Sequence, residues 1–194
     1  MAIIKSHDLY IKAMSGTAMN EEEIMENKRL VEKFPWLWPS DFMWVKIPEE
    51  EYDYTWTILD EFPVGWKKAF AEKMCEEIQE VLEQYGRVET FHIDQLKEKY
   101  GKMRLYFSGA VGEAYSKLRD IIHKYETVST FTCCKCGKPA TRVSSEWICP
   151  YCDDCGDDSS MTPIDEFYKY YDNYELILNN EGLVVDVKEK SPIR

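Results

Sequence analysis

Six of the seven cysteines lie in one short stretch of the chain, at spacings that suit a metal site: Cys133, Cys134, Cys136, Cys149, Cys152 and Cys155. A C-x-x-C pair lets two sulfurs and nearby backbone N–H groups approach one ion, and two such pairs supply four thiolates to Zn²⁺. Four thiolates close a tetrahedron and leave no position for water. The sequence therefore predicts a structural Zn²⁺ site, which indicates a metal-braced binding protein rather than a metalloenzyme.

Two cysteines compete to pair with Cys136 in the first half of this site. Cys133 leaves the usual gap of two residues, and Gly137 follows the pair. Cys134 would leave a gap of one residue, which is rare among zinc ligands. Spacing therefore favours Cys133.

The second half of the site is more open, because Cys152 forms a C-x-x-C pair in both directions. It can pair with Cys149, which is followed by Pro150, or with Cys155, which is followed by Gly156. A glycine after the pair provides the sharp turn that such a knuckle needs. Spacing alone slightly favours Cys152 with Cys155 and leaves both pairings open.

The lack of an export signal and of a long apolar stretch indicates that the cysteines lie in a reducing compartment. The first residues lack the basic and then apolar pattern of a secretory signal, and no stretch approaches eighteen apolar residues. A cysteine cluster in such a chain is more typical of metal binding than of a disulfide framework. We expect a cytoplasmic protein that does not enter a membrane.

The formal net charge is -12 at pH 7, and it is unevenly distributed. Residues 1–65 hold 13 acids and 6 bases, residues 66–148 hold 12 acids and 14 bases, and residues 149–194 hold 11 acids and 4 bases. Excess acid often serves only solubility. It also disfavours direct binding to nucleic acid and suits a protein partner with a basic surface.

Catalytic motifs are missing from the sequence, so we expect no enzyme and assign no catalytic residue. The three histidines, His7, His92 and His123, form no H-E-x-x-H motif. The run from His92 to Asp94 is not the H-x-E of the zinc deaminases. No phosphate-binding loop and no Rossmann glycine pattern occurs.

The apolar pattern predicts helices and short strands in mixed order. Asn20 with Glu23 resembles a capping box, and Trp66, Phe70 and Met74 begin an apolar stripe with a period of four. The expected helices cover residues 20–34, 63–85, 111–126 and 163–171, and the expected strands cover 88–93, 102–108, 141–148, 174–178 and 183–187. A helical turn is expected over 94–100, and the aromatic residues of 34–44 are expected in the core.

This order predicts an α+β fold, with helices packed on a small antiparallel sheet, a zinc-ribbon subdomain and a C-terminal hairpin. The expected division is an α+β domain over residues 1–130 with an aromatic-rich N-terminal part. A zinc-ribbon subdomain follows over 131–160, and an acidic helix and hairpin segment over 161–194.

Several short patterns between Trp56 and Cys155 resemble a family of small uncharacterised phage and prophage proteins. The matching parts are Gly65-Trp66, Cys75-Glu76, the segment from Ile93 to Tyr106, the C-x-x-C-G of Cys133 to Gly137, and the segment from Trp147 to Cys155. Tyr100 replaces the usual Phe. The resemblance implies Cys133, Cys136, Cys152 and Cys155 as the ligands, with Cys134 and Cys149 as additional cysteines, and it brings no activity.

In size, charge and phage-type character the chain is also similar to anti-CRISPR proteins. This likeness implies an inhibitor that binds a host protein with a basic surface, such as Cas9, and blocks loading of nucleic acid. The host cytoplasm is then the expected location.

The alternative is a nucleic-acid-associated zinc ribbon of phage replication or transcription. Four acids beside the cysteines weaken it: Asp153, Asp154, Asp157 and Asp158. The one local basic run, Lys97-Glu98-Lys99 with Arg104, is more typical of a solvated turn whose charges pair with one another.

Overall fold

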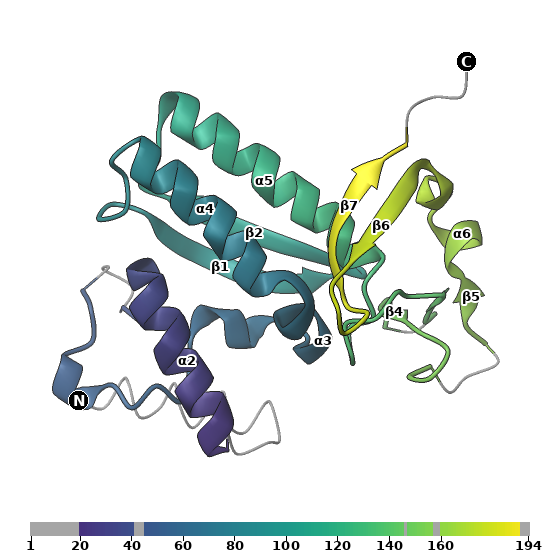
Figure 1. Ribbon diagram of the computed structural model, residues 1–194, viewed down its shortest axis with the longest axis horizontal. Coiled ribbons are helices and arrows are strands. Elements are labelled where there is room, and N and C mark those ends of the chain that lie inside the picture. Colours follow the sequence, from purple (N-terminus) through teal and green to yellow (C-terminus); the bar gives the residue numbers. More distant parts are fainter. Residues whose placement is uncertain (1–19, 41–44, 146, 157–159, 191–194) are drawn as a thin grey trace. The chain divides into compact units, whose positions relative to one another are not determined.

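The computed structural model of the chain describes residues 20–40, 45–145, 147–156 and 160–190. The chain divides into two compact units, residues 1–58 and 59–194 (Figure 1). Helices and small antiparallel sheets alternate along it, so the predicted α+β class is confirmed. The predicted zinc ribbon and C-terminal segment both lie within the second unit. Residues 1–19, for which no regular structure was expected, lie outside the described residues.

The first unit is built around helix α2, Glu21–Lys33. Its predicted capping box is present: the Glu23 N–H donates to Asn20 Oδ1 at 2.9 Å, and the Asn20 N–H donates to Glu23 Oε2 at 3.2 Å. Two short 3₁₀ turns follow, η1 (Pro35–Leu37) and η2 (Glu49–Glu51). The helix ends where Pro35 would leave an internal hydrogen bond unmade.

The aromatic stretch after α2 lies mostly inside, as predicted. Trp36 and Leu37 are buried. Trp38 is half-buried; its indole N–H donates to the Ile47 carbonyl at 2.8 Å, and its ring lies 5.0 Å from that of Tyr52. Residues 41–44 of the same stretch lie outside the described residues.

The 3₁₀ turn η3 (Ile58–Glu61) spans the division between the two units along the chain, and a continuous run of helix follows it in the second unit. This run comprises α3 (Val64–Trp66), the π-helical turn η4 (Lys67–Ala71) and α4 (Glu72–Gln84). The predicted stripe is fully buried and consists of Trp66, Phe70, Met74, Ile78 and Leu82. Gly86 follows with φ +61°, the left-handed conformation of a helix cap.

The hairpin of β1 (His92–Lys99) and β2 (Lys102–Ser108) corrects two predictions. The expected strand over 88–93 and helical turn over 94–100 are wrong, because β1 occupies the second of these segments. A bulge between Ile93 and Gln95 interrupts the pairing with β2. The extra residue breaks the alternation of polar and apolar residues from which a strand is recognised.

Helix α5 (Gly112–Thr130) packs against α4 and β2, and both helices run along the hairpin (Figure 1). It continues beyond the predicted end at Glu126 because its last turn is buried. There the hydroxyl of Ser129 accepts a hydrogen bond from the Met103 N–H at 2.9 Å. This N–H lies on the outer edge of β2 and has no partner strand among the described residues.

The C-terminal third consists of short elements. They are β3 (Arg142–Val143), β4 (Pro150–Tyr151), β5 (Thr162–Pro163), α6 (Ile164–Phe167), η5 (Tyr171–Asn173), β6 (Tyr174–Leu178) and β7 (Val184–Glu189). The predicted strand over 141–148 and helix over 163–171 are longer than the elements found. Strands β3 to β5 form one three-stranded sheet, and the C-terminal hairpin is confirmed as β6–β7.

These short elements share a core around Phe131. Its ring lies 5.1 Å from that of Tyr171 and 5.6 Å from that of Tyr174. Val143 and Ile164 are buried in the same cluster. In the part of the chain that the structure describes, no helix has the length and apolar character needed to span a membrane.

A half-buried ionic network joins α4, α5 and β7. Lys73 Nζ lies 2.6 Å from Asp186 Oδ2, Lys124 Nζ lies 2.5 Å from Glu77 Oε2 and 3.5 Å from Asp186 Oδ2, and the Tyr125 hydroxyl donates to Glu77. Burial alone would raise the Asp186 pKa, but Lys73, the Val187 N–H and Lys124 hold that pKa below its usual value of 3.8.

The substitution Asp186→Asn is expected to lower the free energy of unfolding at pH 7 by about 1 kcal/mol. Because the Asp186 pKa is lower in the folded state, its contribution is present above pH 3.8 and is lost as the pH falls through the folded pKa. Urea unfolding of both proteins at pH 7 and in acid measures this. The exposed control Glu189→Gln is expected to change little, and a difference that persisted in acid would contradict the assignment.

Candidate metal centre

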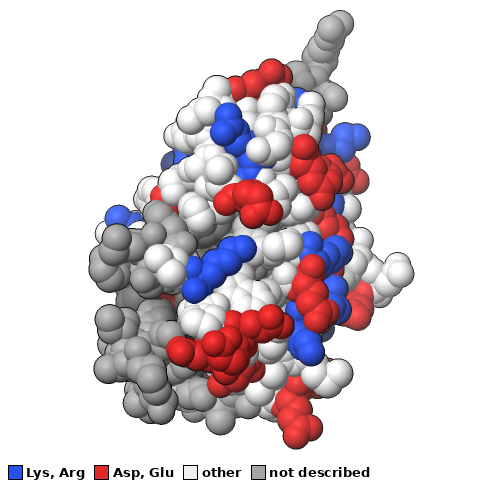
Figure 2. Space-filling view, turned by 90° about the vertical axis from the view of Figure 1, so that its left-hand side faces the viewer, with Lys and Arg blue, Asp and Glu red and all other residues white. Residues whose placement is uncertain are grey.

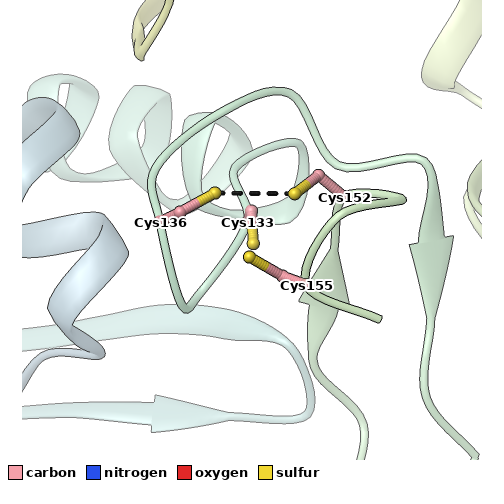
Figure 3. Close-up of side chains that lie close together, drawn as sticks. All are labelled: Cys133, Cys136, Cys152 and Cys155. Carbon is pink, nitrogen blue, oxygen red and sulfur yellow. Dashed lines mark hydrogen bonds between the residues drawn. The ribbon is translucent and has the colours of Figure 1, made fainter. Parts of the chain in front are cut away.

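The four cysteines implied by the family resemblance lie together in the structure. The sulfurs of Cys133, Cys136, Cys152 and Cys155 all lie within 4.8 Å of one another, and those of Cys136 and Cys152 are 3.5 Å apart (Figure 3). A tetrahedral ion with metal–sulfur bonds of about 2.3 Å places its sulfurs about 3.8 Å apart. The group therefore fits one metal ion held by four thiolates.

The first knuckle is shaped by Gly137. Its N–H donates to the Cys133 carbonyl at 2.9 Å, and its φ of +85° is a conformation that residues with a side chain rarely adopt. The Cys133 N–H donates to the Lys138 carbonyl at 2.8 Å. These two bonds fold the chain so that Cys133 and Cys136 point to the same side.

The second knuckle uses the same local bonding. The N–H groups of Cys155 and Gly156 donate to the Cys152 carbonyl at 3.1 and 2.9 Å. Gly156 needs no left-handed backbone here, because its φ lies outside the positive range. A Cβ at this position would lie 3.0 Å from the Met161 sulfur, so the Met161 side chain would have to move by a few tenths of an ångström to admit one.

The close approach of the four sulfurs favours a bound cation. Burial raises the pKa of Cys133, but backbone hydrogen bonds from Cys152, Cys136 and Lys135 outweigh it and lower the pKa below the ordinary thiol value. Burial and the neighbouring sulfurs raise the pKa values of Cys136 and Cys155. Four thiolates this close repel one another, and a divalent ion lets all of them ionise.

Cys134 and Cys149 lie outside the four-sulfur group, although both are buried next to it. The Cys149 N–H donates to Ser144 Oγ at 3.0 Å and its carbonyl accepts the Ser144 N–H, which holds it at the base of the β3–β4 connection. A hydrogen bond from the Cys149 thiol lowers the pKa of Cys134, and the Tyr151 hydroxyl adds to this effect. The two cysteines thus form a second, polar pair.

The first knuckle packs directly on the start of α3. The Gly65 N–H donates to the Cys134 carbonyl at 2.9 Å, and a Cβ on Gly65 would lie 2.2 Å from the Cys133 carbonyl oxygen. The Trp66 indole N–H donates to the Thr132 carbonyl at 2.9 Å. The sequence placed Trp66 in the apolar stripe but predicted no contact of Gly65 or Trp66 with the cysteines. Their place in the Gly-Trp pattern was the signal that could have indicated one.

The turn of the C-terminal hairpin covers the other side of this knuckle. The Val184 N–H donates to the Gly137 carbonyl at 2.9 Å. Leu183 also approaches Gly137: a Cβ added to Gly137 would lie 3.4 Å from Leu183 Cδ2. Segments from three parts of the second unit therefore meet at the metal knuckle.

The acids beside the second knuckle are paired with bases. Asp153 accepts from the Thr141 hydroxyl at 2.8 Å and from Arg142 at 3.2 Å, and both hydrogen bonds lower the Asp153 pKa. Lys138 Nζ lies 3.5 Å from Asp154. Two of the four acids noted beside the cysteines are therefore neutralised by bases. The other two, Asp157 and Asp158, lie outside the described residues.

Histidines take no part in the four-sulfur group. Within the described residues, His92 begins β1 and His123 is exposed on α5. His7 lies outside the described residues. The donor set is sulfur alone, which suits Zn²⁺ and other soft metal ions.

The chain was compared with known families, curated proteins and solved structures. No family model, no curated protein and no solved structure matches it.

Proposed function

We propose that this chain is a non-enzymatic zinc protein of phage type that binds and inhibits a host nucleic-acid enzyme. The closed four-sulfur group carries the proposal, because an ion held by Cys133, Cys136, Cys152 and Cys155 has no open position for substrate or water. Zinc would then serve to hold together the segments that meet at the knuckle. Such bracing suits a small protein that presents a rigid surface to a partner.

The charge of the second unit supports a basic partner. Glu76, Glu80 and Glu83 are exposed at a spacing of four and three residues, so they form one stripe along α4. Figure 2 shows acidic side chains in separate groups beside groups of lysine and arginine. Discrete acidic contacts of this kind favour docking on a basic groove over nonspecific attraction. The proposed inhibitor would occupy the nucleic-acid channel of a nuclease such as Cas9 and block loading.

The test is binding of the purified, zinc-loaded chain to Cas9 and to a second basic nuclease, measured by pull-down at rising salt. The triple variant Glu76→Gln, Glu80→Gln, Glu83→Gln is expected to weaken binding at least tenfold and to reduce its salt dependence. A matched control removes three exposed charges from the β6–β7 hairpin: Glu175→Gln, Glu181→Gln, Glu189→Gln. No binding to either nuclease at low salt would contradict the proposal. An equal loss of binding in both triple variants would show that the acidic stripe of α4 does not form the contact.

A further inference from the structure

The outer face of the β1–β2 hairpin differs in charge from the rest of this acidic chain. The register pairs Gln95 with Tyr106, Lys97 with Arg104, and Lys99 with Lys102. Directly opposed residues share a face, and the buried Leu96 and Leu105 occupy the other one. The outer face therefore carries these six side chains: Gln95, Lys97, Lys99, Lys102, Arg104 and Tyr106. Four of them are basic and none is acidic.

Three of these basic groups have no carboxylate partner among the described residues: Lys97, Lys99 and Lys102. Lys102 lies over the rings of Tyr168 and Tyr170, which leaves the half-buried Lys97 and the exposed Lys99 for a ligand. Arg104 pairs with Glu126 of α5 at 3.3 Å. Lys97 donates to Gln95 Oε1 at 2.6 Å, and Lys99 lies 5.4 Å from the centre of the Tyr100 ring. Among the residues that the structure describes, neither lysine has a carboxylate within 4.0 Å. Glu98 lies on the opposite face and accepts the Gly101 N–H at 2.7 Å.

The tip of the hairpin presents an aromatic ring on a strained backbone. Tyr100 and Gly101 form the two-residue turn, with φ of +55° and +72°. Asn or Gly normally occupies the first of these positions, since a residue with a bulky side chain is disfavoured there. The Tyr100 side chain is 68% exposed, so no packing inside the fold accounts for it. A strained and exposed aromatic residue is typical of a binding surface.

A second exposed ring belongs to a segment that touches this tip. A Cβ on Gly101 would lie 3.2 Å from Ile148 Cγ2, so the hairpin turn touches the β3–β4 connection. Tyr100 directly precedes Gly101, and Trp147, which is 73% exposed, directly precedes Ile148. The Ser144 hydroxyl donates to the Trp147 carbonyl and holds this connection in place. The β3–β4 connection thus brings Ile148 against the hairpin turn, and the exposed Trp147 is the residue before it.

We propose that Lys97, Lys99, Tyr100, Tyr106 and Trp147 form a binding surface for single-stranded nucleic acid, named here the hairpin-tip surface. Lysines meet the phosphates, and exposed rings stack on unpaired bases, whose faces a duplex would hide. This surface lies apart from the acidic stripe of α4 and takes a different ligand, so it goes beyond the function proposed above. The net charge of -12 limits nonspecific binding, so stacking supplies most of the affinity.

The test is fluorescence anisotropy with a labelled twelve-nucleotide oligo(dT), the matching RNA and a duplex of equal length, at low salt. Saturable binding to a single strand, weaker for the duplex, is expected. Trp147→Ala is expected to weaken it roughly fivefold or more, the loss of one stacked base. Tyr100→Asn is expected to weaken binding similarly without lowering the melting temperature, because Asn favours the left-handed turn. This variant separates binding from folding.

The contribution of the lysine charges to binding is tested with a matched control. Lys97→Glu with Lys99→Glu is expected to weaken binding and flatten its salt dependence, whereas Lys188→Glu with Lys190→Glu makes the same charge change at exposed positions at the end of the other hairpin. Three results would overturn the proposal: no saturable binding to either strand, equal loss in both double variants, or competition by polyglutamate as effective as that by oligo(dT).

Discussion

Replacing any one of Cys133, Cys136, Cys152 or Cys155 by Ser is expected to abolish stoichiometric metal binding and unfold the C-terminal third of the chain. Three sulfurs cannot close the tetrahedron, and binding of a structural zinc contributes about 10 kcal/mol or more to folding. This exceeds the whole stability of many domains. Metal content by mass spectrometry and near-ultraviolet circular dichroism of the four variants measure the effect. Chelation of the unmodified protein is expected to reproduce it.

Cys134→Ser and Cys149→Ser provide the matched controls. Both positions are buried beside the site, so these variants lose some stability through packing, but each is expected to retain one metal ion per chain. The comparison separates ligation from burial. Loss of the metal in Cys149→Ser with retention in Cys155→Ser would reverse the ligand assignment, and a metal-free chain that is fully folded would remove the metal from this account.

Gly65→Ala is expected to destabilise the second unit by roughly 3 kcal/mol or more. Helix propensity alone predicts the opposite sign, because Ala in a helix is favoured over Gly by about 1 kcal/mol. Here the added methyl group would lie 2.2 Å from the Cys133 carbonyl oxygen and 2.6 Å from the Gly137 nitrogen. Both neighbours are backbone atoms of the metal knuckle, which cannot move without shifting Cys133.

Two measurements test this clash. Thermal unfolding gives the loss of stability, and competition with a zinc chelator gives the accompanying loss of metal affinity. Gly86→Ala is the control, because nothing lies within 4 Å of its Cβ position and only its φ of +61° opposes the change. It is expected to cost about 1 kcal/mol and to leave metal affinity unchanged. Equal effects in both variants would show that α3 and the knuckle do not pack as described.

Local patterns predicted much of the fold. The capping box of Asn20 and Glu23, the apolar stripe that starts at Trp66 and the alternation in β2 all arise between residues one to four positions apart. Such neighbours interact in the same way wherever the element is placed. β1 was missed because its bulge breaks the period of two, and α5 was predicted too short because burial of its last turn depends on β2.

The sequence by itself determined the chemistry of the site: two C-x-x-C knuckles, each folded by hydrogen bonds to its own first cysteine, and therefore a sulfur-only donor set. The tertiary structure decided three things: which cysteine pairs meet, why position 65 admits no side chain, and why the Gly101 turn touches Ile148. The physical reason is distance along the chain. These features rest on contacts such as that between Trp66 and Thr132, 66 residues apart, which form only when the second unit packs as a whole.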